Sequence, residues 1–375
     1  MTVQKKEPTI VVLQLTGGND YFNCVIPYTD SNYYDNRPAL HVSEDNVLKL
    51  DDELGFHPAM APMTEIYERG DMAIIHGVGY ENSPRSHFRS MDIWHTCEPD
   101  KIGTEGWLGR ALRDIDPNGE NPVTGVNIGQ GLPRALVTPG VSVASVADLS
   151  TYGLLTGIEE EKIRERVLQR FVNMYGQAIG TGLVRDYVGR TGIDALKGAD
   201  ILKDGLDRYS SNVEYASDPV SKSLKDIAMI HTADVGTRVF YAQHGSFDTH
   251  ASQTPAFEAL WTDVSRGISD FWDDLREHDA DDNIIMFIFS EFGRRVKDNG
   301  SGTDHGAGGV CFAIGPSVVG GMHGIYPDTN KESLEQGDLV PNQDFRGVYS
   351  NILEDWMKLD AVPIVDGHFE KPAFV

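Results

Sequence analysis

The sequence has few of the features that mark disulfide-stabilised, membrane or nucleic-acid-binding proteins. Its 375 residues include three cysteines, Cys24, Cys97 and Cys311, which lie far apart. An odd number without paired spacing excludes a disulfide framework and a cysteine zinc motif. The longest apolar runs, such as residues 284–289, are far too short to span a bilayer. Basic residues are also scarce, 32 against 57 acids with a net charge of −25, which argues against nucleic acid and anionic lipid as partners.

The composition is that of a folded protein with a sizeable core. Hydrophobic residues make up 40% of the chain and charged residues 24%, a balance unlike that of disordered proteins. The N-terminal segment 1–8 has no apolar stretch of the kind that directs secretion and leads directly into an apolar run. We therefore expect either a cytoplasmic protein or the mature form of an exported one.

Apolar runs and amphipathic segments alternate along the chain. We expect strands at 9–15, 72–78, 237–243, 284–289 and 310–314, and helices at 59–69, 86–96, 254–278 and 345–358. Such alternation is typical of an α/β fold with a mostly parallel central sheet and helices on both faces. We expect one domain over residues 1–375. Within it, the charged helical stretch 155–230 holds few candidate catalytic groups and is predicted to be a cap insertion.

Polar side chains follow the carboxyl ends of several of these predicted strands. They are Asp20, Ser86, His87, Asp248, His250, Ser290 and Glu291, and the pair Asp304-His305 follows Glu291 within a few residues. In α/β sheets, ligands bind beyond this edge. The shared position therefore predicts one site, and carboxylates with imidazoles are metal-binding groups.

Each acidic group also has a structural interpretation. Asp20 follows a Gly-Gly turn and could bond its own backbone. Asp248 lies two residues before His250, a spacing that suits ligands of one ion, but it could instead begin the next helix. Glu291 ends a buried strand and requires a cation, which could be a metal or one of the nearby Arg294 and Arg295.

The histidines and Ser86 have two interpretations as well. His305 could be a ligand or a loop histidine held by Asp304. Ser86 suits a nucleophile at a helix start, where an anion would meet unpaired amides, or a plain helix cap. Arg85 beside it could hold a phosphate or sulfate group. His87 is expected to be structural or exposed, although it adjoins Ser86.

Five segments occur in the order and at the distances of one bacterial family. They are Gly17-Gly-Asn-Asp20, Arg85-Ser-His-Phe88, Phe247-Asp-Thr-His250, Ser290-Glu-Phe-Gly-Arg294 and Gly302-Thr-Asp-His-Gly306. On these segments the chain, from about residue 9 to 358, resembles the domain-of-unknown-function family numbered fifteen-oh-one. That family is regarded as a divergent branch of the alkaline-phosphatase-like superfamily of phosphatases, sulfatases and phosphoglycerate mutases. The resemblance implies a three-layer, alkaline-phosphatase-like fold. It also implies a periplasmic or secreted location, because many members carry an export signal.

The resemblance assigns roles to individual positions. It implies that Asp20, Asp248, His250 and His305 bind metal and that Ser86 is the nucleophile. The superfamily has an adjacent Asp and His where this chain has Ser290 and Glu291. Because a carboxylate replaces that histidine, the two-zinc arrangement of the superfamily is not the only expectation. The site could instead bind Mn²⁺, Mg²⁺ or Ca²⁺, or a single metal ion.

The sequence thus predicts a metal-dependent hydrolase of phosphate or sulfate esters of a small molecule or glycan. The divalent ion would be held by Asp20, Asp248, His250, Glu291, Asp304 and His305. It would activate Ser86, while Arg85 or Arg294 would offset charge on the ester oxygens. The alternative, which the altered Ser290-Glu291 position favours, is a non-catalytic exported protein that keeps the fold and binds a glycan or another partner.

Overall fold

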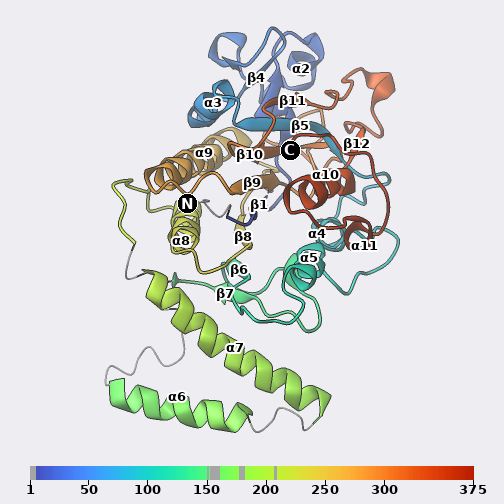
Figure 1. Ribbon diagram of the computed structural model, residues 1–375. Coiled ribbons are helices and arrows are strands. Elements are labelled where there is room, and N and C mark those ends of the chain that lie inside the picture. The colour runs from blue at the N-terminus through green and yellow to red at the C-terminus, as the bar shows by residue number, and fades with distance from the viewer. Residues whose placement is uncertain (1–5, 150–151, 153–160, 177–181, 207–208) are drawn as a thin grey trace.

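A nine-stranded sheet forms the centre of the protein (Figure 1). The computed structural model describes residues 6–149, 152, 161–176, 182–206 and 209–375. The strands are β1 (Thr9–Leu15), β5 (Met72–Gly79), β6 (Gly125–Ile128), β7 (Ala144–Val146), β8 (Val239–His244), β9 (Ile284–Phe289), β10 (Gly309–Ile314), β11 (Gly321–His323) and β12 (Gln343–Asp344). Their order is β11-β5-β10-β9-β1-β8-β6-β7, with β12 also paired to β5. β10 runs antiparallel to β5 and β9, and the other pairs are parallel. The predicted mostly parallel sheet is confirmed.

The central strands are apolar on both faces because each face supports its own core. In β1, Val11 and Leu13 belong to one core, whereas Ile10 and Val12 belong to the other. β9 alternates in the same way, with Met286 facing the first core. A strand buried on both sides reads as a continuous apolar run, and this explains why the sequence identified these strands.

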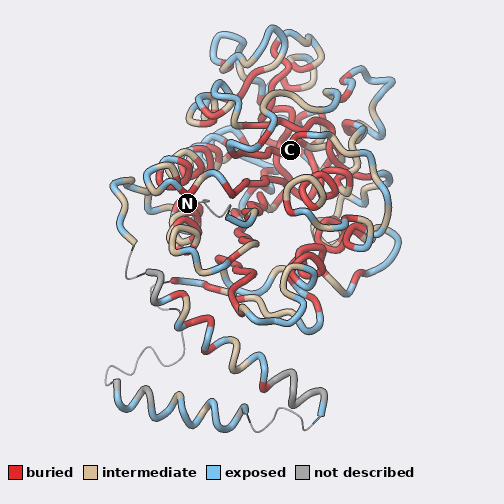
Figure 2. Tube along the Cα trace, in the orientation of Figure 1, coloured by how far each residue is buried: buried red, intermediate tan, exposed pale blue. Residues whose placement is uncertain are grey.

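Helices cover both faces of the sheet, which confirms the three-layer architecture. One layer contains α3 (Ala61–Glu68), α8 (Pro219–Thr232) and α9 (Gln253–Glu277). The other contains α4 (His87–Thr96), α5 (Trp107–Ile115), α10 (Phe345–Asn351) and α11 (Val362–Val365). Figure 2 shows buried residues gathered in the sheet and along the inner sides of these helices.

The last predicted helix changes its winding along its length. The α-helical part ends at Asn351, and residues Ile352–Trp356 form a π-helix. The amide of Met357 donates to the carbonyl of Ile352, five residues earlier. The helix predicted over 345–358 is therefore confirmed in position, but its second half is a π-helix instead of an α-helix.

A second, three-stranded sheet and two short helices occupy the region between β1 and α3. The sheet has the order β2-β4-β3 and consists of β2 (Val25–Pro27), β4 (Leu54–Phe56) and β3 (Leu48–Lys49). The helices are α1 (Tyr21–Cys24) and α2 (Ser31–Asn36). Sequence patterns did not predict this region, whose elements are too short to carry a clear period.

The predicted cap insertion, 155–230, contains α6 (Glu161–Gly176), α7 (Leu183–Leu206) and α8; its residues 155–160, 177–181 and 207–208 lie outside the described residues. α8 belongs to the helix layer next to α9. α6 and α7 lie side by side beyond β6 and β7 (Figure 1). Asp194 of α7 accepts a hydrogen bond from Ser142, which precedes β7. A role as a substrate cap stays a prediction.

β1, β5, β8 and β9 run in the same direction, so their carboxyl ends meet at one edge of the sheet. The loops after these strands carry the polar groups considered next. Among the described helices, none has the length and apolar character needed to cross a bilayer.

Candidate metal centre

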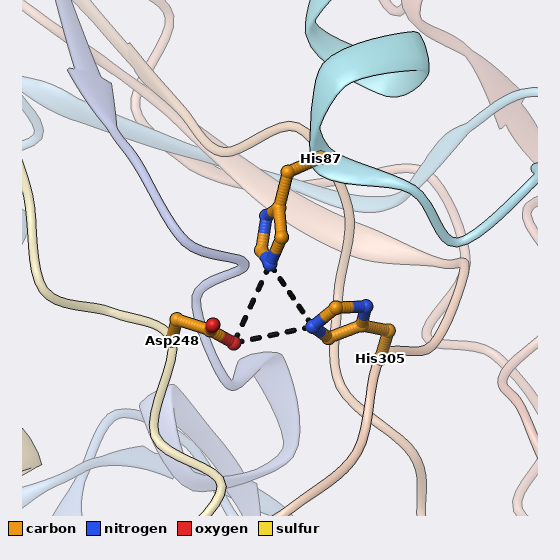
Figure 3. A group of neighbouring side chains, drawn as sticks. All are labelled: His87, Asp248 and His305. Atoms are coloured by element: carbon orange, nitrogen blue, oxygen red, sulfur yellow. Dashed lines mark hydrogen bonds and ion pairs between the residues drawn. The ribbon is translucent and has the colours of Figure 1, made fainter.

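Three side chains from separate segments of the chain meet at the carboxyl edge of the sheet (Figure 3). His87 is the first residue of α4, Asp248 follows β8, and His305 precedes β10. One ligand atom of each lies within 4.8 Å of those of the other two. The Nε2 atoms of His87 and His305 are 2.9 Å apart, and His305 Nε2 is 3.1 Å from Asp248 Oδ1.

The outer nitrogen of each ring is fixed by an acceptor. His87 Nδ1 lies 2.8 Å from Glu291 Oε1, and His305 Nδ1 lies 2.9 Å from the carbonyl oxygen of Arg85. An ionised carboxylate and a carbonyl only accept hydrogen bonds, so both Nδ1 atoms carry the proton. In the neutral rings, the Nε2 lone pairs then face each other.

His250 extends the cluster by a third imidazole. Its Nε2 is 3.0 Å from His305 Nε2 and 3.1 Å from Asp248 Oδ1. Its Nδ1 lies 3.2 Å from Asp304 Oδ1, which orients the ring as Glu291 orients His87. Asp304 thus contacts the nitrogen of His250 that points away from the cluster.

The arrangement requires a cation. Lone pairs on facing nitrogens and a carboxylate oxygen repel one another unless protons or a metal ion lie between them. Rings whose second nitrogen is held by a carboxylate or a carbonyl are characteristic of metal-binding histidines. The donor set of imidazole nitrogens and one carboxylate therefore fits a divalent metal ion.

Charges nearby hold the acidic group in its ionised form. Partial burial raises the pKa of Asp248, but the hydrogen bond and the positive charge of Arg294 outweigh this and bring the pKa to about 2. The hydrogen bond to the Glu291 carboxylate raises the pKa of His87 above its ordinary value. Asp248 is consequently charged at any ordinary pH.

Glu291 lies behind the cluster. Its side chain is 1% exposed, and Oε1 accepts from the Gly17 amide at 2.8 Å as well as from His87. Ser290 beside it connects two strands, because its hydroxyl accepts from the Asn19 amide at 2.9 Å and donates to the Leu15 carbonyl at 2.6 Å. Both groups order the loops that carry the cluster.

Asp20 is buried in an ion pair. Its carboxylate accepts hydrogen bonds from Arg37 Nη1 at 2.6 Å and Nη2 at 2.8 Å, and from Gln253 Nε2 at 2.5 Å. Arg37 and Asp20 are 0% and 1% exposed. The structure does not bring Asp20 together with His87, Asp248 and His305 into one ligand group.

Arg294 holds the loops of the cluster together. Its guanidinium is buried and donates to the carbonyls of Gly17, Gly18 and Thr303 and to Asp248 Oδ1, the last at 2.6 Å. The Gly17 turn fits because it has no side chain: a Cβ there would lie 2.4 Å from the Asp248 nitrogen. Arg294 thus acts on the neighbouring loops and on Asp248.

Ser86 and Arg85 lie at the start of α4. The Ser86 hydroxyl makes no capping hydrogen bond to the helix. Arg85 has a positive φ of 52°, an uncommon conformation that residues at functional sites adopt. Its side chain donates to Asp338 Oδ2 at 2.5 Å. Its carbonyl, as described above, fixes His305.

Sequence reasoning missed His87 as a member of the cluster. The signal was present, because His87 directly follows Ser86 at a predicted helix start after a strand. Of the predicted ligands, Asp248 and His305 lie in the cluster and His250 adjoins it.

Comparison with protein families gives one match. Residues 203–348 match the model of the family described as Protein of unknown function (DUF1501). The resemblance stated from the sequence is confirmed over this stretch, which contains Asp248, Glu291 and His305 but not His87. Among curated proteins, none matches the chain at a significant level.

Solved structures with a similar chain path include sulfatases and alkaline phosphatase superfamily members. The PsFucS1 sulfatase from a Pseudoalteromonas species is 12% identical with a TM-score of 0.38, over 96% of this chain and 68% of that one. The periplasmic domain of EcEptC from Escherichia coli, in complex with Zn, is 9% identical with a TM-score of 0.37, over 83% and 73%. An alkaline phosphatase superfamily protein from Vibrio parahaemolyticus is 8% identical with a TM-score of 0.37, over 88% and 65%. Sequence identities and TM-scores this low give no information on the activity of this chain.

Proposed function

We propose that the protein is a metal-dependent hydrolase of phosphate or sulfate esters, with one divalent ion held by His87, Asp248 and His305. The observation that carries the proposal is the convergence of ring nitrogens and a carboxylate at the carboxyl edge of the sheet, each ring anchored from behind. This edge is where α/β proteins bind their ligands. His250 is the nearest further imidazole and adjoins this three-residue ligand set, which leaves a fourth position for solvent or substrate.

The donor set favours zinc over the harder ions. Imidazole nitrogens suit Zn²⁺, whereas Mg²⁺ and Ca²⁺ prefer oxygen ligands. Glu291, which had pointed to a harder ion, contacts His87 and the Gly17 amide and so supports the ligands from behind. We therefore infer a zinc-type ion, with Glu291 and Asp304 as the groups that orient the rings.

The accessibility of the cluster supports catalysis rather than a structural role. The side chains of Asp248 and His250 are 47% and 44% exposed, and those of His87 and His305 are 24% and 22% exposed. Structural zinc sites are closed by four protein ligands, while catalytic sites keep a position open to solvent or substrate.

Ser86 is the proposed nucleophile because it immediately precedes His87 and its hydroxyl does not cap the helix. When bound, the ion would stabilise the ester oxygens as a Lewis acid and lower the pKa of a nearby hydroxyl. The Ser86 oxygen would attack the phosphorus or sulfur atom in line with the ester oxygen, which would leave as an alcohol while the Ser86 proton passes to it through solvent. Water would then cleave the phospho- or sulfo-serine, releasing phosphate or sulfate and restoring the Ser86 hydroxyl. Amides at the start of α4 would face the remaining oxygens, which carry negative charge.

The experiment is a paired measurement of metal content and ester turnover. We expect protein purified without chelators to bind zinc and to hydrolyse an aryl phosphate or an aryl sulfate. His305→Ala is expected to lose both metal and turnover, and Ser86→Ala to keep the metal and lose turnover. His368→Ala, which changes an exposed histidine away from the cluster, is the matched control.

Two outcomes would contradict the proposal. If His305→Ala retains as much zinc as the wild type, the cluster is not the metal site. If zinc is bound but no ester is turned over, or if Ser86→Ala is as active as the wild type, the serine hydrolase mechanism is wrong. Bound metal without turnover across a broad ester panel would instead favour the non-catalytic binding protein.

A further inference from the structure

A cavity of about 510 Å³ lies beside the candidate metal centre. One wall is the segment 79–85, which begins at the last residue of β5, and the other consists of residues 335, 336 and 338–344 together with Ala307. Cavities of this size hold small organic molecules. The proposed mechanism uses none of the side chains that line it.

The cavity adjoins the cluster through Arg85 and Ala307. The Arg85 side chain lines the cavity, while its carbonyl oxygen lies 2.9 Å from His305 Nδ1. Ser86 is the next residue of the chain, and Ala307 is two residues beyond His305. A group attached to an ester oxygen at the cluster could therefore extend into this cavity.

The lining is rich in acceptors and carries negative charge. Four carboxylates line it, from Glu81, Glu335, Asp338 and Asp344, against the single guanidinium of Arg85. That guanidinium is already paired with Asp338 at 2.5 Å. Such a lining disfavours a second anionic group and suits a ligand that donates hydrogen bonds.

Two of these carboxylates have acceptor capacity left. Within the part of the chain that the structure describes, the exposed side-chain carboxylates of Glu81 and Glu335 have no hydrogen-bond or ion-pair partner. The carboxylate of Asp338 is instead buried, paired with Arg85 and 3.6 Å from Arg295 Nε. A ligand hydroxyl or ammonium group would therefore donate to Glu81 and Glu335.

We propose that this cavity is the subsite for the leaving group of the ester, and that the leaving group is a sugar or amino sugar. The inference rests on the proposed function for its link to catalysis. The hydroxyl or ammonium groups of the sugar would donate to Glu81 and Glu335, whereas a carboxylate-bearing leaving group would be repelled.

Binding of the free sugar tests the subsite without any turnover. Glucosamine, glucose and glucuronate are titrated separately into the zinc-loaded protein by calorimetry or by ligand-observed NMR. We expect glucosamine and glucose to bind and glucuronate to bind at least tenfold more weakly. Glu335→Arg, which places a long cation in the cavity, is expected to weaken glucosamine binding at least tenfold. Glu332→Arg is the matched control, because it reverses an exposed acid three residues before Glu335 that does not line the cavity.

A second variant separates the cavity from changes in folding. Glu81→Gln combined with Glu335→Gln removes two charges that stabilise no contact in the protein, and we expect a fivefold or greater loss of glucosamine affinity with unchanged zinc content. Equal binding of glucuronate and glucosamine, or unchanged binding by Glu335→Arg, would overturn the subsite.

Turnover then distinguishes this inference from the proposed function. If the protein hydrolyses esters but Glu335→Arg has the KM of the wild type for glucosamine 6-phosphate and 6-sulfate, the subsite is wrong and the hydrolase stands. If glucosamine binds and Glu335→Arg abolishes binding while no ester is hydrolysed, the cavity is a sugar site and the hydrolase is wrong.

Discussion

Replacing Glu291 by Gln tests whether this carboxylate orients a ligand or is itself a ligand. The amide oxygen of Gln can still accept from the Gly17 amide and from His87 Nδ1, so the change removes the charge and keeps the shape. We expect zinc to bind about tenfold more weakly.

The magnitude follows from the contact between Glu291 and His87. A hydrogen bond to a charged group contributes about 1.5–3 kcal/mol, and one between neutral groups about 0.5–1.5 kcal/mol. The difference of about 1–1.5 kcal/mol corresponds to roughly a tenfold change in affinity. It also agrees with the roughly 10–100-fold effect of groups that orient metal-binding histidines.

The assay is competition for zinc between the protein and a chromophoric chelator, with wild type, Glu291→Gln and His305→Ala measured together. Glu258→Gln is the control, because it removes one exposed acidic charge on α9 and so changes the net charge equally. A loss as large as that of His305→Ala would show that Glu291 is a ligand. A change of less than twofold would refute the orienting role.

Three further predictions follow from the same contacts. The protein is expected to bind one zinc ion per chain by elemental analysis, because Asp20 and Glu291 are committed to Arg37 and His87; two ions per chain would contradict this. Asp20→Asn leaves Arg37 buried without its charge partner, so we expect a loss of about 3–5 kcal/mol in the free energy of unfolding, measured with urea, and unchanged zinc content; a near-neutral effect would refute the pairing. Burial lowers the pKa of His76 and His95 to about 4, so the unfolded chain takes up protons before the folded one. Each histidine is therefore expected to reduce stability by on the order of 3 kcal/mol as the pH falls from 6.5 to 4, with no effect above pH 6.5, and urea unfolding across this range checks it.

Strands and the edge of the sheet were predictable from the sequence because burial on both faces leaves a continuous apolar signal. β1 and β9 are such strands, and the polar residues that follow them had to meet at one edge. Asp248 was placed at this edge by the same argument, whereas His305 was a candidate because it lies beside Asp304 and because of the family resemblance. The short elements between β1 and α3 have no such period and were not predicted.

The partners of the charged groups were not predictable because several cations compete for each acid. The sequence left Glu291 with two alternatives, a metal or an ion pair with Arg294 or Arg295. In the structure Glu291 accepts from Gly17 and His87, and Arg294 instead contacts Asp248. Arg37, the partner of Asp20, lies in a segment without a recognisable motif. Tertiary packing decides such pairings, and no local spacing records them.

Arg294 has a consequence for how the protein acquires and loses its ion. One buried guanidinium joins the turn after β1, the loop after β8 and the loop before β10. The hydrogen bonds of Arg294 therefore hold these loops in place without a bound metal ion. Protein from which a chelator has removed the metal is expected to stay folded and to bind the ion again, in contrast to small domains that unfold when their metal is removed.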